Sequence, residues 1–269
     1  MKTGIVLLPL LLPAALLGSV RGEEALVSIA SRMDPVPWAG NRFAGAVLTA
    51  PGWLGLEERP DILYGRPMTD GETNGESVLS VRSRGFGVAT ESARWGENRE
   101  MRRYAVVAAR PVSPSAALAL SYTWYTSEDD DLDGLSSWDL GLAWRASRRV
   151  QVSATGRNLL RAELGDAKLG RYAEAGIRVV LLPPSLACFA EARRLAGDRF
   201  DDVAPSFGAE WDPIRFLRLR GRTDTMGNRG LGVEIEYGSS SVGFHYLFSG
   251  GAQDRSYAYV KLHVPSPAR

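Results

Sequence analysis

The strongest constraint on the fold is an alternation of apolar and polar residues with a period of two, which dominates the chain from about residue 77 onward. Leu118, Leu120, Tyr122 and Trp124 form one apolar stripe, with smaller or polar residues between them. Successive residues of a strand point to opposite faces, so each such segment has one apolar and one polar face. The pattern predicts an all-β protein, and it recurs in residues 138–145, 150–155, 231–237 and 242–248.

The connections between these segments are alternately short and long. Short connections such as 111–115 and 146–149 contain Pro, Gly, Ser or Asp, the residues that close tight turns. Longer polar links such as 127–136 and 158–171 lie between them. Outer-membrane barrels have this asymmetry, with short periplasmic turns and long outer loops, whereas a β-sandwich has no reason to keep it.

We count fourteen expected strands, and an even count places both chain ends on the periplasmic side. Several of them have about the length that a tilted strand needs to cross a bilayer. The expected strands are residues 61–66, 77–83, 86–94, 102–110, 116–126, 137–145, 150–157, 172–181, 186–194, 205–211, 216–222, 230–237, 241–248 and 256–263.

The N-terminus has the layout of a secretory signal peptide. Lys2 precedes an apolar run at residues 5–17, and Val20 and Gly22 stand at the −3 and −1 positions of a cleavage site. We therefore expect residues 1–22 to be removed and the chain to be exported. Residues 23–60 lack strict alternation and contain four prolines, so we expect a segment that plugs the barrel or leads into it.

No later stretch reaches about 18 consecutive apolar residues, so the sequence predicts no membrane-spanning helix. A sheet can cross a membrane only as a closed barrel, because lipid offers no partner to unpaired backbone groups. The prediction is a single antiparallel up-and-down transmembrane β-barrel of about 14 strands over residues 61–264, with an N-terminal plug-like segment and a short tail at 265–269.

Composition excludes several other classes of protein. The net charge of +1 gives no electrostatic case for binding nucleic acid. The single cysteine, Cys188, excludes an internal disulfide and any cysteine-based zinc site. Charged residues make up 23% of the chain, and a membrane barrel must place them in its interior and its loops.

The polar faces of the expected strands carry charges of both signs, which we expect to line the barrel interior. Two interpretations stay open: a polar pore that binds or passes a solute, and an interior closed by salt bridges. The expected lining residues are Asp139, Arg145, Arg157, Glu174, Arg178, Glu191, Arg193, Glu210, Arg218, Arg220, Arg222, Glu234 and Glu236.

An acidic loop carries the sharpest local motif. Asp129, Asp131 and Asp133 stand at alternate positions before Gly134, as in the first half of a calcium loop. Leu140 stands where a bidentate glutamate would complete the helix–loop–helix version of such a site. A solvated acidic loop is the favoured interpretation, and a calcium site at the outer surface is the alternative; the sequence indicates no other cofactor.

Aromatic residues near the ends of the expected strands suit girdles at the two membrane interfaces, and packing in a soluble core is the alternative. These residues are Trp53, Trp95, Trp124, Tyr125, Trp138, Trp144 and Trp211.

Catalysis has little support in the sequence. His245 and His263 have no local spacing typical of a metal site or a catalytic triad, and no nucleophile elbow or phosphate-binding loop is present. Cys188 falls on the apolar side of its expected strand, so we expect it to be inert. We do not expect an enzyme.

The hairpin at residues 140–159 resembles a recurring unit of the FadL-like and PorV-like outer-membrane barrels. In that unit a strand ending in an aromatic residue and Arg meets a tight turn, and the return strand ends in Arg157-Asn158-Leu159. Residues 49–56 are similar to the Asn-Pro-Ala-Gly-Leu motif before the first strand of these barrels. The resemblance implies a fourteen-stranded barrel with an N-terminal plug.

The expected function is a transport or channel barrel for a small solute, hydrophobic by resemblance to that family. One alternative is a non-transporting barrel that serves as an accessory or scaffold for a secretion or envelope partner, and the other is a soluble periplasmic β-sandwich that binds a ligand. The expected partners are outer-membrane lipid, the barrel-assembly machinery and an envelope protein.

Overall fold

The computed structural model describes residues 46–56, 59–68, 76–95, 99–128, 133–160, 163–164, 167–168, 171–183, 185–195, 204–225, 227–248 and 255–264. The predicted signal peptide at 1–22, the first part of the predicted plug at 23–45 and the tail at 265–269 lie outside these residues, so these three predictions stay predictions.

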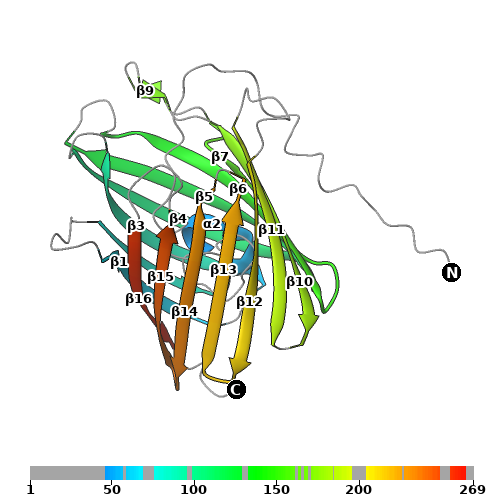
Figure 1. The fold of residues 1–269 in the computed structure, drawn as a ribbon. Coiled ribbons are helices and arrows are strands. Elements are labelled where there is room, and N and C mark those ends of the chain that lie inside the picture. Colours follow the sequence, from blue (N-terminus) through cyan, green and yellow to red (C-terminus); the bar gives the residue numbers. More distant parts are fainter. Residues whose placement is uncertain are drawn as a thin grey trace.

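Fourteen strands of the described residues close into an antiparallel barrel in which each strand pairs with its neighbours in the chain and β1 pairs with β16 (Figure 1). The predicted up-and-down barrel is therefore confirmed. Its strands are β1 (Asp61–Pro67), β2 (Ser77–Ser83), β3 (Phe86–Trp95), β4 (Arg99–Ser113), β5 (Ala116–Ser127), β6 (Ser136–Arg145), β7 (Val150–Arg157), β10 (Tyr172–Leu182), β11 (Leu186–Leu195), β12 (Ala204–Ile214), β13 (Leu217–Asp224), β14 (Arg229–Tyr237), β15 (Ser240–Phe248) and β16 (Arg255–His263).

The polarity of the wall is inverted relative to that of a soluble protein. On β5, Leu118 and Leu120 are 43% and 46% exposed, whereas Ser121 and Thr123, which occupy alternate positions of the same strand, are buried. The inward positions of a barrel wall must be small or polar to fit the interior, and the outward ones can be large and apolar. The period-two alternation therefore predicted not only the strands but also the direction in which their side chains point.

Three strands extend beyond the predicted boundaries into the turns at one end of the barrel. The register shifts at Pro111/Ser113, Val180/Leu182 and Trp211/Ile214, each just before a short turn. A bulge accommodates a residue that cannot continue the ladder, and proline, which lacks an N–H group, is tolerated there. The sequence pattern treated these residues as turns because proline and serine are frequent in both settings.

The long link between β7 and β10 contains a two-residue hairpin, β8 (Glu163–Leu164) and β9 (Ala167–Lys168), which is separate from the barrel and which the sequence did not predict. Two residues per strand are too few to produce a visible alternation.

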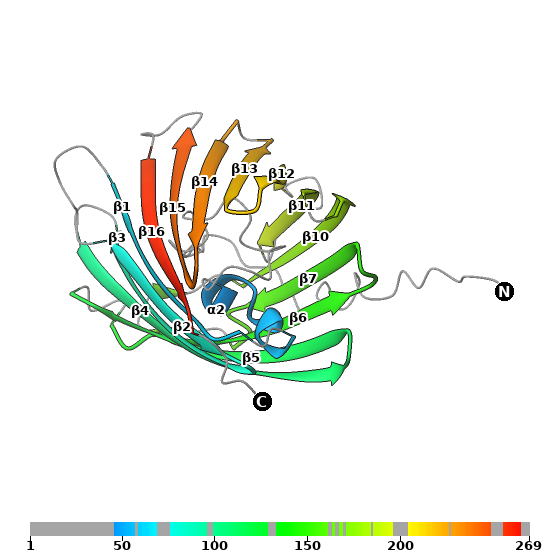
Figure 2. The same cartoon turned by 90° about the horizontal axis from the view of Figure 1, so that it is seen from below.

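A short segment at residues 46–56 lies inside the ring of strands, as the end-on view shows (Figure 2). It forms the helix α2 (Ala46–Thr49) and the 3-10 helix η3 (Pro51–Gly55), and η3 contacts β3 to β7. Neither helix is long or apolar enough to span a membrane. We refer to residues 46–56 as the inner segment.

The inner segment approaches the wall backbone to backbone. A Cβ atom on Gly52 would lie 2.6 Å from the backbone nitrogen of Ala143, and one on Gly141 would lie 2.8 Å from Cγ of Pro51. Both glycines therefore allow a contact that any side chain would prevent.

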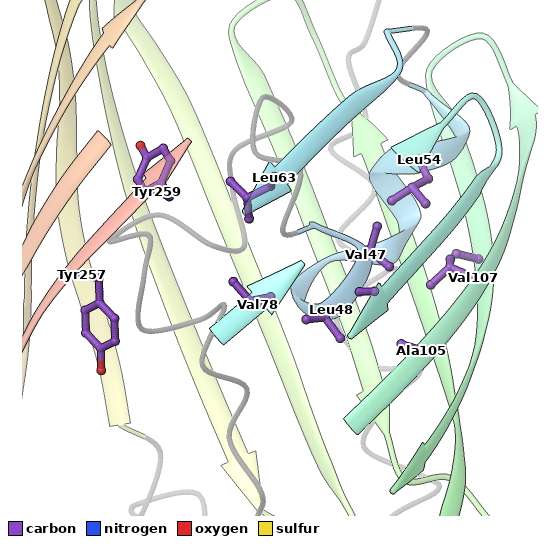
Figure 3. Close-up of a cluster of buried hydrophobic side chains, with 11 residues drawn as sticks. Val47, Leu48, Leu54, Leu63, Val78, Ala105, Val107, Tyr257 and Tyr259 are labelled. Atoms are coloured by element: carbon purple, nitrogen blue, oxygen red, sulfur yellow. The ribbon is translucent and has the colours of Figure 1, made fainter. Parts of the chain in front are cut away.

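The interior has an apolar sector on one side (Figure 3). There Val47, Leu48 and Leu54 of the inner segment pack against inward side chains of β1 to β5 and β16. The wall residues of this sector are Leu63, Val78, Ala89, Ala105, Val107, Ala119, Tyr257 and Tyr259.

Outward aromatic residues gather at the end of β4, β5 and β6 that carries the long links. The Tyr104 and Trp124 rings stack with centroids 5.3 Å apart, and the Tyr122 ring contacts those of Trp124 and Trp138 at 5.8 and 5.0 Å. This arrangement suits an interfacial girdle.

Two residues of the predicted girdle lie elsewhere. Trp53 is fully buried in the inner segment, and Tyr125 is 2% exposed on the inner face of β5. The girdle interpretation was wrong for both. Tyr125 follows the outward Trp124 and therefore points inward by alternation, and Trp53 lies in a segment without alternation.

Candidate interior site

The thirteen predicted interior residues all occupy inward positions of their strands. Nine are buried: Asp139, Arg157, Glu174, Arg178, Glu191, Glu210, Arg218, Arg220 and Glu234. Four are partly buried: Arg145, Arg193, Arg222 and Glu236. The structure divides most of them between two ion-pair networks.

The first network is centred on Arg157 of β7. Its Nη1 atom lies 2.9 Å from Oδ2 of Asp139, and its Nε atom lies 3.4 Å from Oε2 of Glu174. Arg193 approaches the other oxygen of Glu174 at 2.8 Å. All three partners of these contacts come from neighbouring strands, so the network crosses β6, β7, β10 and β11.

Arg157 also binds the inner segment. Its Nη2 atom donates a hydrogen bond of 2.5 Å to the backbone carbonyl of Thr49. Asp139, the partner of Arg157, accepts a hydrogen bond of 2.9 Å from the backbone N–H of Asn158, which has a positive φ of 53°. Asparagine tolerates this left-handed conformation better than most residues. In the hairpin formed by β6 and β7, Arg157 therefore fixes the inner segment, and Asn158 fixes the end of β7.

Arg145 makes a second contact with the inner segment. Its Nη2 atom donates a 3.1 Å hydrogen bond to the carbonyl of Leu56, and its guanidinium carbon lies 6.0 Å from the centre of the Trp53 ring. Arginines of the hairpin formed by β6 and β7 therefore hold the inner segment at two points, Thr49 and Leu56.

The second network joins β10, β12, β13, β14 and β16. Arg178 lies 2.7 Å from Glu210, and Arg220 lies 3.2 Å from Glu210 and 3.1 Å from Glu234. Lys261 forms an ion pair with Glu234. Burying charges is costly unless they are paired, and each charge of this network has a partner of opposite sign.

Arg218 occupies the edge of the second network. It contacts Asp212 at 2.9 Å and Glu236 at 3.1 Å, and it reaches Glu234 at 3.6 Å. Glu236 is the most exposed member, with its side chain 38% accessible.

Glu191 and Arg222 form a looser pair at 3.8 Å, and Ser206 donates a 3.4 Å hydrogen bond to Glu191. These two charges were predicted as interior residues, and the structure brings them together only weakly.

Several interior residues were missed by the sequence analysis. Arg82 forms a buried ion pair with Asp61, whose other oxygen lies 2.5 Å from Nδ1 of His263. Arg103 lies 3.8 Å from Glu91. Asp61, Arg82 and Glu91 lie on the first three strands, which carry too few large apolar residues to show from sequence which face is inward.

The predicted calcium loop falls largely outside the described residues, since Asp129 and Asp131 are not among them. Asp133 is exposed and accepts a 3.2 Å hydrogen bond from the backbone N–H of Ser127. Among the described residues, no group of three His, Cys, Asp or Glu side chains is placed to hold a metal ion.

Cys188 lies at an outward position of β11 and is partly buried, as the alternation predicted. Its inward neighbour Phe189 covers Gly208 of β12, where a Cβ atom would lie 2.1 Å from the ring. The ring fills space that the glycine leaves on the inner face.

No protein-family model matches the chain, and no curated protein matches it by sequence. Solved structures do match by fold. The toluene transporter TbuX of Ralstonia pickettii superposes with a TM-score of 0.58 at 13% identity, over 91% of this chain and 99% of that one.

Two further matches have the same character. The toluene transporter TodX of Pseudomonas putida gives a TM-score of 0.58 at 9% identity, over 89% of this chain and 97% of that one. A FadL homologue of Pseudomonas aeruginosa gives 0.54 at 10% identity, over 90% and 97%. The chain therefore has the fold of the FadL-type outer-membrane barrels, which confirms at the level of the fold the FadL-like part of the resemblance drawn from its sequence.

Proposed function

We propose that this chain is an exported barrel of a bacterial outer membrane that passes a small apolar solute. The observation that carries the proposal is the inverted polarity of the wall. Large apolar side chains cover its outside, and ionised side chains are buried inside. The exposed apolar residues include Leu118, Leu120, Leu140, Ile177, Phe207, Leu231, Ile235, Val242, Phe244, Val260 and Leu262. A closed sheet with such an exterior suits hydrocarbon, because closure leaves no unpaired edge and, among the side chains that the structure describes, none at an outward mid-strand position is charged.

The apolar sector supports an apolar solute. It runs along the inner faces of β1 to β5 and is covered by Val47, Leu48 and Leu54 of the inner segment. The side chains of Val47, Leu48 and Leu54 meet the wall through apolar contacts, which an apolar molecule could replace at a low cost. A 2.9 Å hydrogen bond from the N–H of Gly85 to the carbonyl of Leu54 holds the backbone of the inner segment beside this sector. Two of the structural relatives are toluene transporters, which agrees with this solute class.

A second candidate is a barrel that does not transport and instead holds an envelope partner. It is favoured by the two ion-pair networks, which fill the charged side of the interior with paired side chains. In both candidates outer-membrane lipid surrounds the wall and the barrel-assembly machinery inserts it. We propose transport or scaffolding rather than catalysis.

Fractionation of the producing bacterium tests the location. We expect the chain in the outer membrane, and we expect a faster-migrating folded form on SDS gels without boiling. Recovery of the folded chain in the soluble periplasm would contradict the membrane assignment.

Uptake of a labelled aromatic hydrocarbon by cells or vesicles that carry the barrel tests the transport. Leu48→Asn places a polar group in the apolar sector, and Leu118→Asn makes the same change on the outside. We expect only Leu48→Asn to change uptake. We expect both variants to show the same fast-migrating folded form on SDS gels without boiling. Uptake equal to that of barrel-free membranes, together with capture of a stable envelope protein, would favour the scaffold.

A further inference from the structure

A groove of ≈ 830 Å³ lies on the wall formed by β12 to β15. Ala209 and Gly221 form its shallow floor, and both occupy outward positions. The exposed side chains of Phe207, Leu231 and Phe248 stand around it. The groove is therefore an apolar hollow in the outer surface of the barrel.

The hollow exists because two small residues are paired across β12 and β13. Ala209 lies opposite Gly221, and Gly221 lies opposite Leu231 of β14. The nearest atom to a Cβ placed on Gly221 would be Cδ2 of Leu231 at 3.8 Å, an ordinary contact. Packing therefore does not require glycine at position 221, and a larger side chain there would fill the groove without strain.

The groove does not open into the interior. β12 pairs with β13 without a break from Ser206 to Trp211, and β13 pairs with β14 without a break from Leu217 to Thr223. A molecule in the groove would remain outside the wall, in the space that the proposed function assigns to lipid.

A cation stands at the rim of the groove. Arg229 is the first residue of β14, it is exposed, and it lies opposite Thr223 and Phe248 in the sheet. No carboxylate of the described residues forms an ion pair with it. A guanidinium beside a hydroxyl offers several donors to a phosphate.

We propose that this groove binds a phosphorylated lipid of the outer leaflet, with an acyl chain over Gly221 and a phosphate at Arg229 and Thr223. The inference rests on the proposed function, because it requires the barrel to span a membrane with its long links outward. The apolar floor of the groove then lies at the depth of the acyl chains, and its cationic rim lies at the depth of the headgroups.

The test uses the full folded chain in phosphatidylcholine nanodiscs doped with lipid A, with dephosphorylated lipid A in a parallel sample. Native mass spectrometry after delipidation counts the lipid that stays bound. We expect the unmodified chain to retain phosphorylated lipid A. Gly221→Leu fills the position of the acyl chain, and Arg229→Gln removes a charged hydrogen bond to the phosphate, so we expect each variant to weaken retention by about tenfold.

Arg66→Gln and Ala258→Leu are the matched controls, since Arg66 is an exposed outward arginine at the same end of the barrel and lies opposite the outward Ala258. We expect both to retain lipid as the unmodified chain does. Equal retention in all variants, or equal retention of dephosphorylated lipid A, would overturn the proposal. Failure to fractionate with outer membranes would instead overturn the proposed function.

Discussion

Arg157 on the barrel wall donates a hydrogen bond to the backbone carbonyl of Thr49 in the inner segment, across 108 residues of sequence. The same guanidinium is paired with Asp139 and Glu174. One side chain therefore joins the wall, the ion-pair network and the inner segment.

Replacing this side chain tests its importance. Arg157→Met removes the ion-pair partner of the buried Asp139 and leaves Glu174 paired with Arg193, so we expect the free energy of unfolding to fall by about 3–5 kcal/mol. Denaturant titration in detergent micelles, followed by the heat-modifiable form on gels, measures the change. Arg102→Met is the control, because its pair with Glu100 is exposed at 57% and 46%; a change below about 1 kcal/mol is expected there. Similar losses in both variants would show that burial of the network does not matter.

The contact between Gly52 and Gly141 should position the inner segment. Gly141→Val places a Cβ atom 2.8 Å from Cγ of Pro51, so the segment must move while the strand pairing remains. A cysteine at the buried position Ala50, in a Cys188→Ser background, reports this movement through its rate of labelling by a maleimide. We expect faster labelling with Gly141→Val and no change with Gly221→Val. Unchanged labelling in both would mean that the segment tolerates the added side chain.

The seam between the first and last strands should depend on Asp61. This carboxylate is fully buried and contacts both Arg82 and His263. Asp61→Ala leaves the buried Arg82 without this partner, and we expect hydrogen exchange to accelerate first at the paired amides of β1 and β16. The β10–β11 pair serves as the internal control. A uniform acceleration over all strands would contradict a local role.

The outer belt gives a depth-dependent prediction. Phe244→Arg places a charge on the outward face at mid-strand, and we expect a loss of about 2–4 kcal/mol in vesicles. Tyr237→Arg, at a strand end where the side chain is 86% exposed, should cost about 0–1 kcal/mol. Refolding into vesicles and denaturant titration compare the two. Equal costs at both positions would contradict a hydrocarbon-facing exterior.

The sequence predicted the wall better than the contents of the barrel. Leu118 and Leu120 indicated a strand because successive residues of a strand point to opposite faces of the sheet. The same local rule predicted the fourteen strands and the charged residues on their inner faces. Arg157 and Glu234 lie buried on the face that this rule assigns to the interior.

The missed features depend on pairings that no local rule contains. Asp61 and His263 are separated by 202 residues and meet only because the barrel closes. Trp53 lies in a segment without alternation, so its aromatic character suggested an interface instead of the interior. Which arginine pairs with which carboxylate follows from the register between strands, which alternation leaves undetermined.

The two sides of the interior differ in how freely they can change during evolution. In the ion-pair networks, replacing one charged residue leaves its partner as an unpaired buried charge, so accepted substitutions there must occur in pairs. In the sector formed by Val47, Leu63, Val107 and their neighbours, one aliphatic residue can replace another with little penalty. Close relatives that handle different molecules should therefore diverge first along β1 to β5, while the arginine-rich wall opposite keeps its composition.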